Sequence, residues 1–199
     1  IYLTAREIAG YTTLAVDRKR GEIVWRRNLT VPELDAAHAY NGGAAPTPAA
    51  DEEGVYVYFP SFGLIAYRHD GAERWRRPLS IPGTPFGTAS SPVIWRDRLF
   101  LVRDGGLVSA YDALTGNPVF LLERLGQIGD YYASPVAADG RIYVSALTGT
   151  LFVIEAGDEP EVIARNEIGE RIAATPALAG RVLYLRTSQA LYAFGQRED

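Results

Sequence analysis

The sequence predicts an all-β protein, a β-propeller of four-stranded antiparallel blades that forms a partial or open ring. Three observations predict this fold class: a short motif recurs at a nearly constant spacing, β-rich segments follow each copy, and helical periodicity is nowhere sustained. Apolar residues stand at nearly consecutive positions in the central strands, as in sheets covered on both faces. A two-layer sandwich would instead show alternation of apolar and polar residues.

The recurring motif is a Ser/Thr-Pro-Ala/Val triplet at the start of each repeat. Its copies have prolines 44, 43 and 41 residues apart and read Thr47-Pro48-Ala49, Ser91-Pro92-Val93, Ser134-Pro135-Val136 and Thr175-Pro176-Ala177. This spacing lies in the range of propeller blades. Each proline precedes a first, innermost strand, where the missing N–H is tolerated.

The second and third strands follow in every repeat. Segments rich in Val, Ile, Tyr and Phe predict second strands over 54–59, 98–102, 140–146 and 180–185. A tight connection, with glycine in three of four cases, leads to third strands over 64–68, 107–112, 151–155 and 190–195. Each repeat is therefore expected to form a meander.

The fourth strand opens with a Gly-x-x-x-aromatic spacing. It runs from Gly21 to Trp25, from Gly71 to Trp75 and from Gly116 to Phe120. We expect these aromatic side chains to wedge between adjacent blades. Asp17 and Asp112, in the preceding turns, are expected to accept hydrogen bonds from backbone amides, so they have a structural role.

The repeats divide the single domain 1–199 into three complete blades and two partial ones. Complete blades are predicted over 46–79, 90–125 and 133–169, with partial blades over 1–29 and 173–195. The predicted total of 18 strands is not a multiple of four, so the strands cannot all belong to complete four-stranded blades. We therefore expect a fragment, either an open arc or a ring completed by residues outside the sequence, whose open edges allow self-association.

Two segments carry a family resemblance. Ala15-Val16-Asp17 with Gly21 and Trp25, and Ala110-Tyr111-Asp112 with Gly116 and Phe120, resemble the Ala-x-Asp-x-x-x-Gly-x-x-x-Trp signature of PQQ-like (quinoprotein-like) propeller repeats. The resemblance covers essentially the whole chain. The family includes quinoprotein alcohol dehydrogenases and BamB-type outer-membrane assembly proteins, and it implies an extracytoplasmic location, periplasmic or secreted. One turn, 68–71, is a residue short, and the repeat 133–169 has no tryptophan.

The resemblance leaves two functions open. The favoured one is a non-catalytic scaffold, similar to BamB-type proteins, that binds protein or peptide partners on its loop face. The alternative is part of a PQQ-dependent dehydrogenase or of a carbohydrate-processing propeller enzyme. Quinoprotein dehydrogenases hold the quinone beside a disulfide and a calcium ion with Glu, Asn and Asp ligands. The chain has no cysteine and no matching ligand set, so we expect no cofactor, no metal and no catalytic residue.

Composition limits the classes of partner that we expect for this protein. The net charge of −4 and the pI near 5.3 give no attraction to nucleic acid, which is not expected as a partner. No apolar run approaches the roughly 18 residues of a membrane span. The first residues do not resemble a signal peptide, so none is expected in this chain.

Candidate contact residues lie in the loops that lead into the innermost strands. These loops are expected at the mouth of the central channel, where propeller ligands commonly meet side chains. An aromatic set with amide and imidazole groups suits a peptide or an oligosaccharide, although His38 and Asn41 could instead cap backbone and the aromatics could plug the channel. His69 is interpreted as a solvated turn residue. The candidates are His38, Tyr40, Asn41, Phe86, Tyr131 and Tyr132.

Overall fold

The computed structural model describes residues 1–34, 43–80, 89–126 and 129–195 of the 199-residue chain. The predicted fold class is confirmed: these residues form 18 strands and no helix, and the strands pair into antiparallel sheets of three, four, four, four and three. We call the five sheets blades 1 to 5. No helix in this part of the chain is long and apolar enough to cross a membrane.

Strand bounds follow the chain order, and strands within each blade pair in sequence. Blade 1 contains β1 (Tyr2–Glu7), β2 (Gly10–Val16) and β3 (Ile23–Thr30). Blade 2 contains β4 (Ala49–Ala50), β5 (Val55–Phe59), β6 (Gly63–Tyr67) and β7 (Glu73–Pro78). Blade 3 contains β8 (Val93–Trp95), β9 (Arg98–Arg103), β10 (Leu107–Asp112) and β11 (Pro118–Arg124). Blade 4 contains β12 (Val136–Ala138), β13 (Arg141–Ser145), β14 (Thr150–Glu155) and β15 (Val162–Glu167), and blade 5 contains β16 (Ala177–Ala179), β17 (Val182–Arg186) and β18 (Leu191–Gly195).

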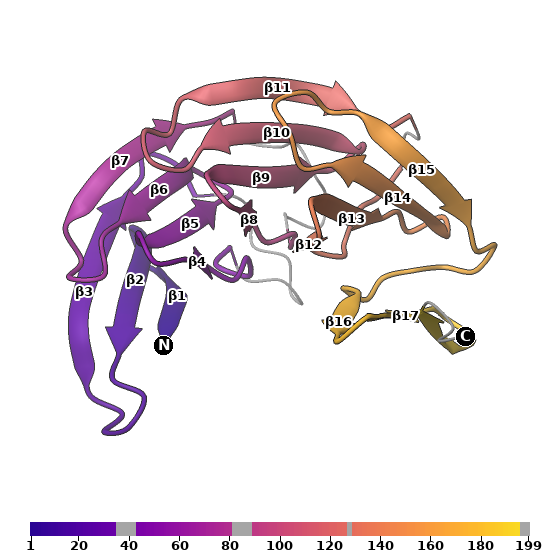
Figure 1. Cartoon of the computed structure of the whole chain (residues 1–199). Helices are drawn as coiled ribbons and strands as arrows, with labels where there is room; N and C mark the ends of the chain where they lie inside the picture. Colours follow the sequence, from indigo (N-terminus) through magenta and orange to yellow (C-terminus); the bar gives the residue numbers. More distant parts are fainter. Residues whose placement is uncertain (35–42, 81–88, 127–128, 196–199) are drawn as a thin grey trace.

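The blades fan out into an arc that does not close (Figure 1). The short strands β4, β8, β12 and β16 lie on its inner side, and each contacts the next. Blade 1 stands at one end of the arc and blade 5 at the other. Two blade faces therefore have no neighbouring blade in this structure.

The hydrophobic core lies between blades. Every residue of β5 and β6 is buried, because each of these strands is covered on both faces. Separate clusters fill the interfaces, and those between the first four blades each contain at least eight buried residues. The cluster between blades 4 and 5 has only three, Leu151, Ile172 and Leu185. The last blade is thus held by the smallest core.

The triplets form a chain of hydrogen bonds between blades. The Thr47 amide donates to the Ser91 hydroxyl (2.9 Å), the Ser91 amide to the Ser134 hydroxyl (2.9 Å) and the Ser134 amide to the Thr175 hydroxyl (3.0 Å). The hydroxyls of Ser91, Ser134 and Thr175 therefore each tie one innermost strand to the preceding one. This hydrogen bond explains why Ser or Thr recurs at the first position of the triplet, which the sequence pattern alone did not show.

The turn residues largely behave as expected. Asp17 Oδ1 accepts from the amides of Lys19 (2.9 Å) and Arg20 (2.8 Å), and Asp112 Oδ1 accepts from the Thr115 amide (2.8 Å). His69 differs, because its ring bonds the Tyr2 hydroxyl (2.7 Å) and the Asp51 carbonyl (3.0 Å). His69 is exposed, as expected of a solvated turn residue, and its ring also links blade 1 to blade 2.

Candidate binding site on the loop face

Two kinds of loop meet on one side of the arc. One joins the last strand of a blade to the next innermost strand, and the other joins the second and third strands of a blade. Backbone bonds connect them: the Leu147 amide donates to the Asp130 carbonyl (2.9 Å), and the Ser188 amide donates to the Arg171 carbonyl (2.9 Å). We call this surface the loop face and define it by the segments 104–106, 129–135, 146–149, 168–176 and 187–190.

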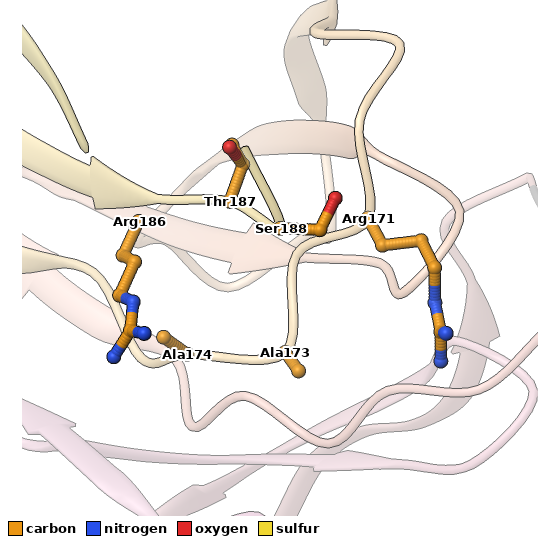
Figure 2. A pocket seen from close by; sticks show the side chains of 6 residues that line it. All are labelled: Arg171, Ala173, Ala174, Arg186, Thr187 and Ser188. Carbon is orange, nitrogen blue, oxygen red and sulfur yellow. The ribbon is translucent and has the colours of Figure 1, made fainter. Parts of the chain in front are cut away.

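A cavity of 460 Å³ opens on the loop face at blade 5. Arg171, Ala173 and Ala174 come from the segment between β15 and β16, and Arg186 ends β17. Figure 2 shows the two arginine side chains on opposite sides of the two alanines. Thr187 and Ser188, in the turn after β17, complete the lining. The cavity therefore has cationic flanks and a small apolar floor.

The turn behind the cavity is fixed by Glu170. Its carboxylate accepts hydrogen bonds from the Thr187 hydroxyl and from the Tyr192 hydroxyl (2.8 Å). The bond to the Glu170 carboxylate is the main cause that raises the pKa of Tyr192. The Thr187 hydroxyl also accepts from the Ala190 amide (2.9 Å). Because these groups are bonded to one another, Ser188 and the guanidinium groups are the ones that can receive a ligand.

The two arginines are exposed cations that form no salt bridge with any residue the structure describes. A guanidinium presents a planar fork of N–H donors that matches a carboxylate, and it stays charged at any physiological pH. Although the whole chain carries a net negative charge, this cavity favours an anionic group. Its chemistry is that of binding, since arginine cannot serve as a general base.

Tyr132 borders the same surface from blade 4. Its hydroxyl donates to Asp130 Oδ2 (3.2 Å). Burial is the largest cause that raises the pKa of Tyr132, the Asp130 charge adds to the rise, and the Arg171 charge opposes it. Tyr132 does not line the cavity itself.

The other predicted contact residues have different positions. Tyr131 is 2 % exposed, and its ring packs so closely on Gly106 that a Cβ there would lie 2.6 Å from the Tyr131 hydroxyl. Tyr131 therefore supports the loop from within the core, and burial raises its pKa. The remaining candidates, which lie outside the described residues, are His38, Tyr40, Asn41 and Phe86.

Sequence reasoning missed the two arginines, although one signal was available. Arg103 ends β9 as Arg186 ends β17, and both pair with the first residue of the following strand. Arg103 is 8 % exposed and donates to the Ser80 carbonyl (3.3 Å). An alignment of the repeats places Arg186 at the position of Arg103, but only the structure shows that Arg186 is exposed.

The residues do not fit the cofactor of the quinoprotein dehydrogenases. The chain has no cysteine for the paired sulfurs that the resemblance implies. Within residues 1–34, 43–80, 89–126 and 129–195, no three His, Asp or Glu side chains gather as metal ligands would. No step of quinone chemistry is therefore assigned to these residues.

Solved structures confirm the architecture. BamB from Moraxella catarrhalis matches with a TM-score of 0.71 at 15% identity, over 96% of this chain and 56% of that one. The quinohemoprotein alcohol dehydrogenase of Comamonas testosteroni matches with 0.70 at 14% identity, over 98% of this chain and 39% of that one. The computationally designed Ika4 protein matches with 0.57 at 12% identity, over 82% of this chain and 97% of that one. At these identities the likeness concerns the fold alone, and this chain spans about half the length of the BamB structure.

Sequence comparison assigns the family. No curated protein matches the sequence. The family model described as outer membrane protein assembly factor BamB matches residues 12–198, which is nearly the entire chain. This match agrees with the repeat signature at Asp17, Gly21 and Trp25 and with the blades seen in the structure. The chain belongs to the BamB-like family of PQQ-repeat β-propellers.

Proposed function

We propose that this chain is part of a non-catalytic propeller scaffold that binds a segment of a partner protein on its loop face, in an extracytoplasmic compartment. The observation that carries the proposal is the cavity between Arg171 and Arg186, two cations without a salt-bridge partner among the described residues. The name of the matching family, an outer membrane protein assembly factor, supports both a protein partner and this location.

The cavity suits an extended peptide that carries a carboxylate. The guanidinium groups would hold an Asp or Glu side chain, or a chain terminus, by charge-assisted hydrogen bonds. The floor of Ala173 and Ala174 leaves room for the peptide backbone, because its side chains are only methyl groups. Tyr132 would contribute a flat apolar contact beside the charged site.

A peptide pair tests the proposal directly. The probe is a fluorescein-labelled decapeptide of Gly, Ala and Tyr with one central Asp, and its partner has Asn in place of the Asp. We expect fluorescence anisotropy to show tighter binding of the Asp peptide to the full chain. Arg171→Ala and Arg186→Ala should each weaken that binding about tenfold, which equals about 1.4 kcal/mol.

The matched control is Arg141→Ala. Arg141 starts β13, lies at the turn between first and second strands, and forms its ion pair with Asp139 (3.0 Å) away from the cavity. This variant should bind the Asp peptide as the unmodified chain does. Equal affinity for the Asp and Asn peptides, or equal losses in all three variants, would contradict the proposal.

A further inference from the structure

The first three blades each contain a pair of aromatic side chains that packs into the interface with the next blade. One ring lies on the outermost strand and the other lies two strands further in. The register places an alanine of the intervening strand between them. The pairs, with the distances between ring centroids, are Tyr2 with Trp25 (5.9 Å), Tyr56 with Trp75 (6.2 Å) and Phe100 with Phe120 (6.4 Å).

Blade 4 retains only one member of this pair. Tyr143 of β13 pairs with Val153, and Val153 pairs with Ala164 of the outermost strand β15. Tyr143 therefore has the register position of Tyr56, and Ala164 has that of Trp75. A methyl group stands where each of the first three blades has an aromatic ring.

The interface of blades 2 and 3 shows what surrounds the ring when it is present. Trp75 packs against blade 3 within one apolar cluster. The blade 3 members that share a face of their sheet are Ile94, Leu99 and Tyr111, because Leu99 pairs with both of the others. Leu99 and Tyr111 are 0 % and 1 % exposed. These side chains are shielded from water where the tryptophan is in place.

Blade 5 has a matching apolar row that is not shielded. Leu183 pairs with Leu178 and with Phe194, so these residues have the register positions of Leu99 and its partners. Together with Tyr143 they line the cavity of 590 Å³ between blades 4 and 5. Leu178 and Phe194 are 38 % and 43 % exposed. The cavity therefore has the walls of a tryptophan site without the tryptophan.

The rim of this cavity is polar. Arg141 and Asp139 line it from blade 4 as an exposed ion pair (3.0 Å), and Arg181 lines it from blade 5. Apolar walls with a few polar groups, in a volume of about 300–1,000 Å³, are typical of pockets for small ligands. A guanidinium can also lie over a bound aromatic ring, as that of Arg27 does over Trp25 at 5.8 Å from the ring centroid.

We propose that the cavity between blades 4 and 5 binds an external aromatic ring of about the size of indole. The ring contacts Tyr143 of blade 4 on one side and Leu183 and Phe194 of blade 5 on the other. Binding removes the apolar walls from water and restores the aromatic pairing that the other blades have within the chain. The same ring can arrive as a free aromatic compound or as a tryptophan side chain, and the experiment separates these two sources.

The test uses two fluorinated probes with the full chain. One is 5-fluoroindole, and the other is N-acetyl-5-fluorotryptophan amide, which carries the same ring on a peptide unit. We expect titrations followed by fluorine NMR to show saturable binding. Binding of 5-fluoroindole alone identifies a free compound as the ligand, whereas binding of the amide identifies a tryptophan side chain.

A variant pair on blade 5 locates the binding. Phe194→Ala should weaken it about fivefold to tenfold, as expected for the loss of one aromatic contact. Tyr184→Ala is the matched control, because Tyr184 is 37 % exposed and does not line the cavity. It alternates along β17 with Leu183 and Leu185, so it lies on the opposite face of the blade. This variant should bind both probes as the unmodified chain does.

Ala164→Trp supplies the ring from within the chain. The new indole should fill the cavity, raise the midpoint of thermal unfolding by about 2–4 °C and weaken the binding of both probes at least about tenfold. The control is Ile163→Trp. Ile163 is the neighbouring residue of β15, is 45 % exposed and does not line the cavity. Tryptophan at this position should neither raise the midpoint nor weaken probe binding.

Three results would overturn the proposal. The first is the absence of saturable binding of both probes. The second is equal probe affinity of the Phe194→Ala and Tyr184→Ala variants, a comparison that decides the question even where circular dichroism shows that Ala164→Trp does not fold. The third is undiminished probe binding by a folded Ala164→Trp variant. None of these depends on the peptide site of the loop face, which is a separate cavity.

Discussion

The interface between blades 1 and 2 and the interface between blades 4 and 5 differ in how completely they are filled. The first contains a tryptophan, its arginine, a close-packed glycine and a core of ten buried residues. The second, among the described residues, has no tryptophan, a core of three buried residues and a cavity of 590 Å³ lined by both blades. Where the repeat signature is intact the blades pack closely on each other, and where it degenerates a cavity remains between them.

The interface of blades 4 and 5 lacks the wedge of the degenerate repeat. The register corrects the expectation that Val162 or Ile163 takes the tryptophan position of blade 4: Ala164 pairs with Val153 as Trp25 pairs with Ala15 and Trp75 with Ala66. Val162 and Ile163 are exposed. The larger cavity is lined by Tyr143 of blade 4 and by Leu183 and Phe194 of blade 5. The smaller cavity is separate, because it opens at the loop face between the two arginines and has no lining residue from blade 4. A small side chain at the tryptophan position thus accompanies the cavity between blades 4 and 5.

The largest expected effect is that of Trp25→Ala. The side chain is 7 % exposed and bonded to His69, so its removal should lower the free energy of unfolding by about 3–5 kcal/mol. Val162→Ala at the corresponding strand of blade 4 should cost less than about 0.5 kcal/mol, as exposed substitutions do. Urea unfolding followed by tryptophan fluorescence and circular dichroism measures both. If the two substitutions lowered the free energy of unfolding by similar amounts, the two interfaces would not differ in packing as described.

A smaller effect is expected for Gly116→Ala. The new Cβ would lie 2.6 Å from Trp75, which adds an overpacking cost of about 1–3 kcal/mol to the strain of positive φ. Gly180→Ala is the matched control, because Gly180 also has positive φ (+59°) but no atom within 4 Å of the built Cβ. Gly180→Ala should lower the free energy of unfolding only by the strain of a side chain at positive φ, about 1–2 kcal/mol. If chemical denaturation gave equal losses, close packing at Gly116 would not matter.

The smallest effect concerns the Asp112 turn and its pH dependence. The hydrogen bond from the Thr115 hydroxyl is the main cause that lowers the pKa of Asp112 below its ordinary value, and the nearby Arg98 adds to it. Because the folded pKa is lower than the unfolded one, this carboxylate stabilises the fold above pH 4. The contribution disappears as the pH falls through the folded pKa.

Asp112→Asn should therefore weaken the pH dependence of the free energy of unfolding at acidic pH. We expect a loss of about 0.5 kcal/mol at pH 7, as for other partly exposed charges, and a smaller loss at pH 2. Thermal unfolding at both pH values measures it, and Asp139→Asn, in an exposed ion pair with Arg141, is the control. A loss that is equal at both pH values would show that the Asp112 charge has no role.

Much of the fold could be predicted from particular residues. The spacing of Pro48, Pro92, Pro135 and Pro176 indicated the repeat, and the order of β-rich segments indicated a four-stranded meander. These features are local, because strand propensity and turn chemistry depend on neighbouring residues. Asp17 and Asp112 were assigned correctly for the same reason.

The candidate site was harder to predict because it joins distant segments. Arg171 lies in the segment between β15 and β16 and Arg186 ends β17, so no pattern within one segment marks both. Tyr131 and Tyr132 are adjacent and chemically alike, but one is packed in the core and the other borders the surface. Neighbouring side chains of an extended segment point in opposite directions, so which one faces the surface depends on how the loop docks.

The amino-acid sequence by itself determined the repeat, the strands, the turns and the family. Only the tertiary structure decided which blade faces are covered, that Ser134 and its equivalents bond from blade to blade, and that the interface of blades 4 and 5 stays partly open. The physical reason is that each strand forms from local propensity and pairing, whereas a cavity between blades depends on the shape of two sheets packed together.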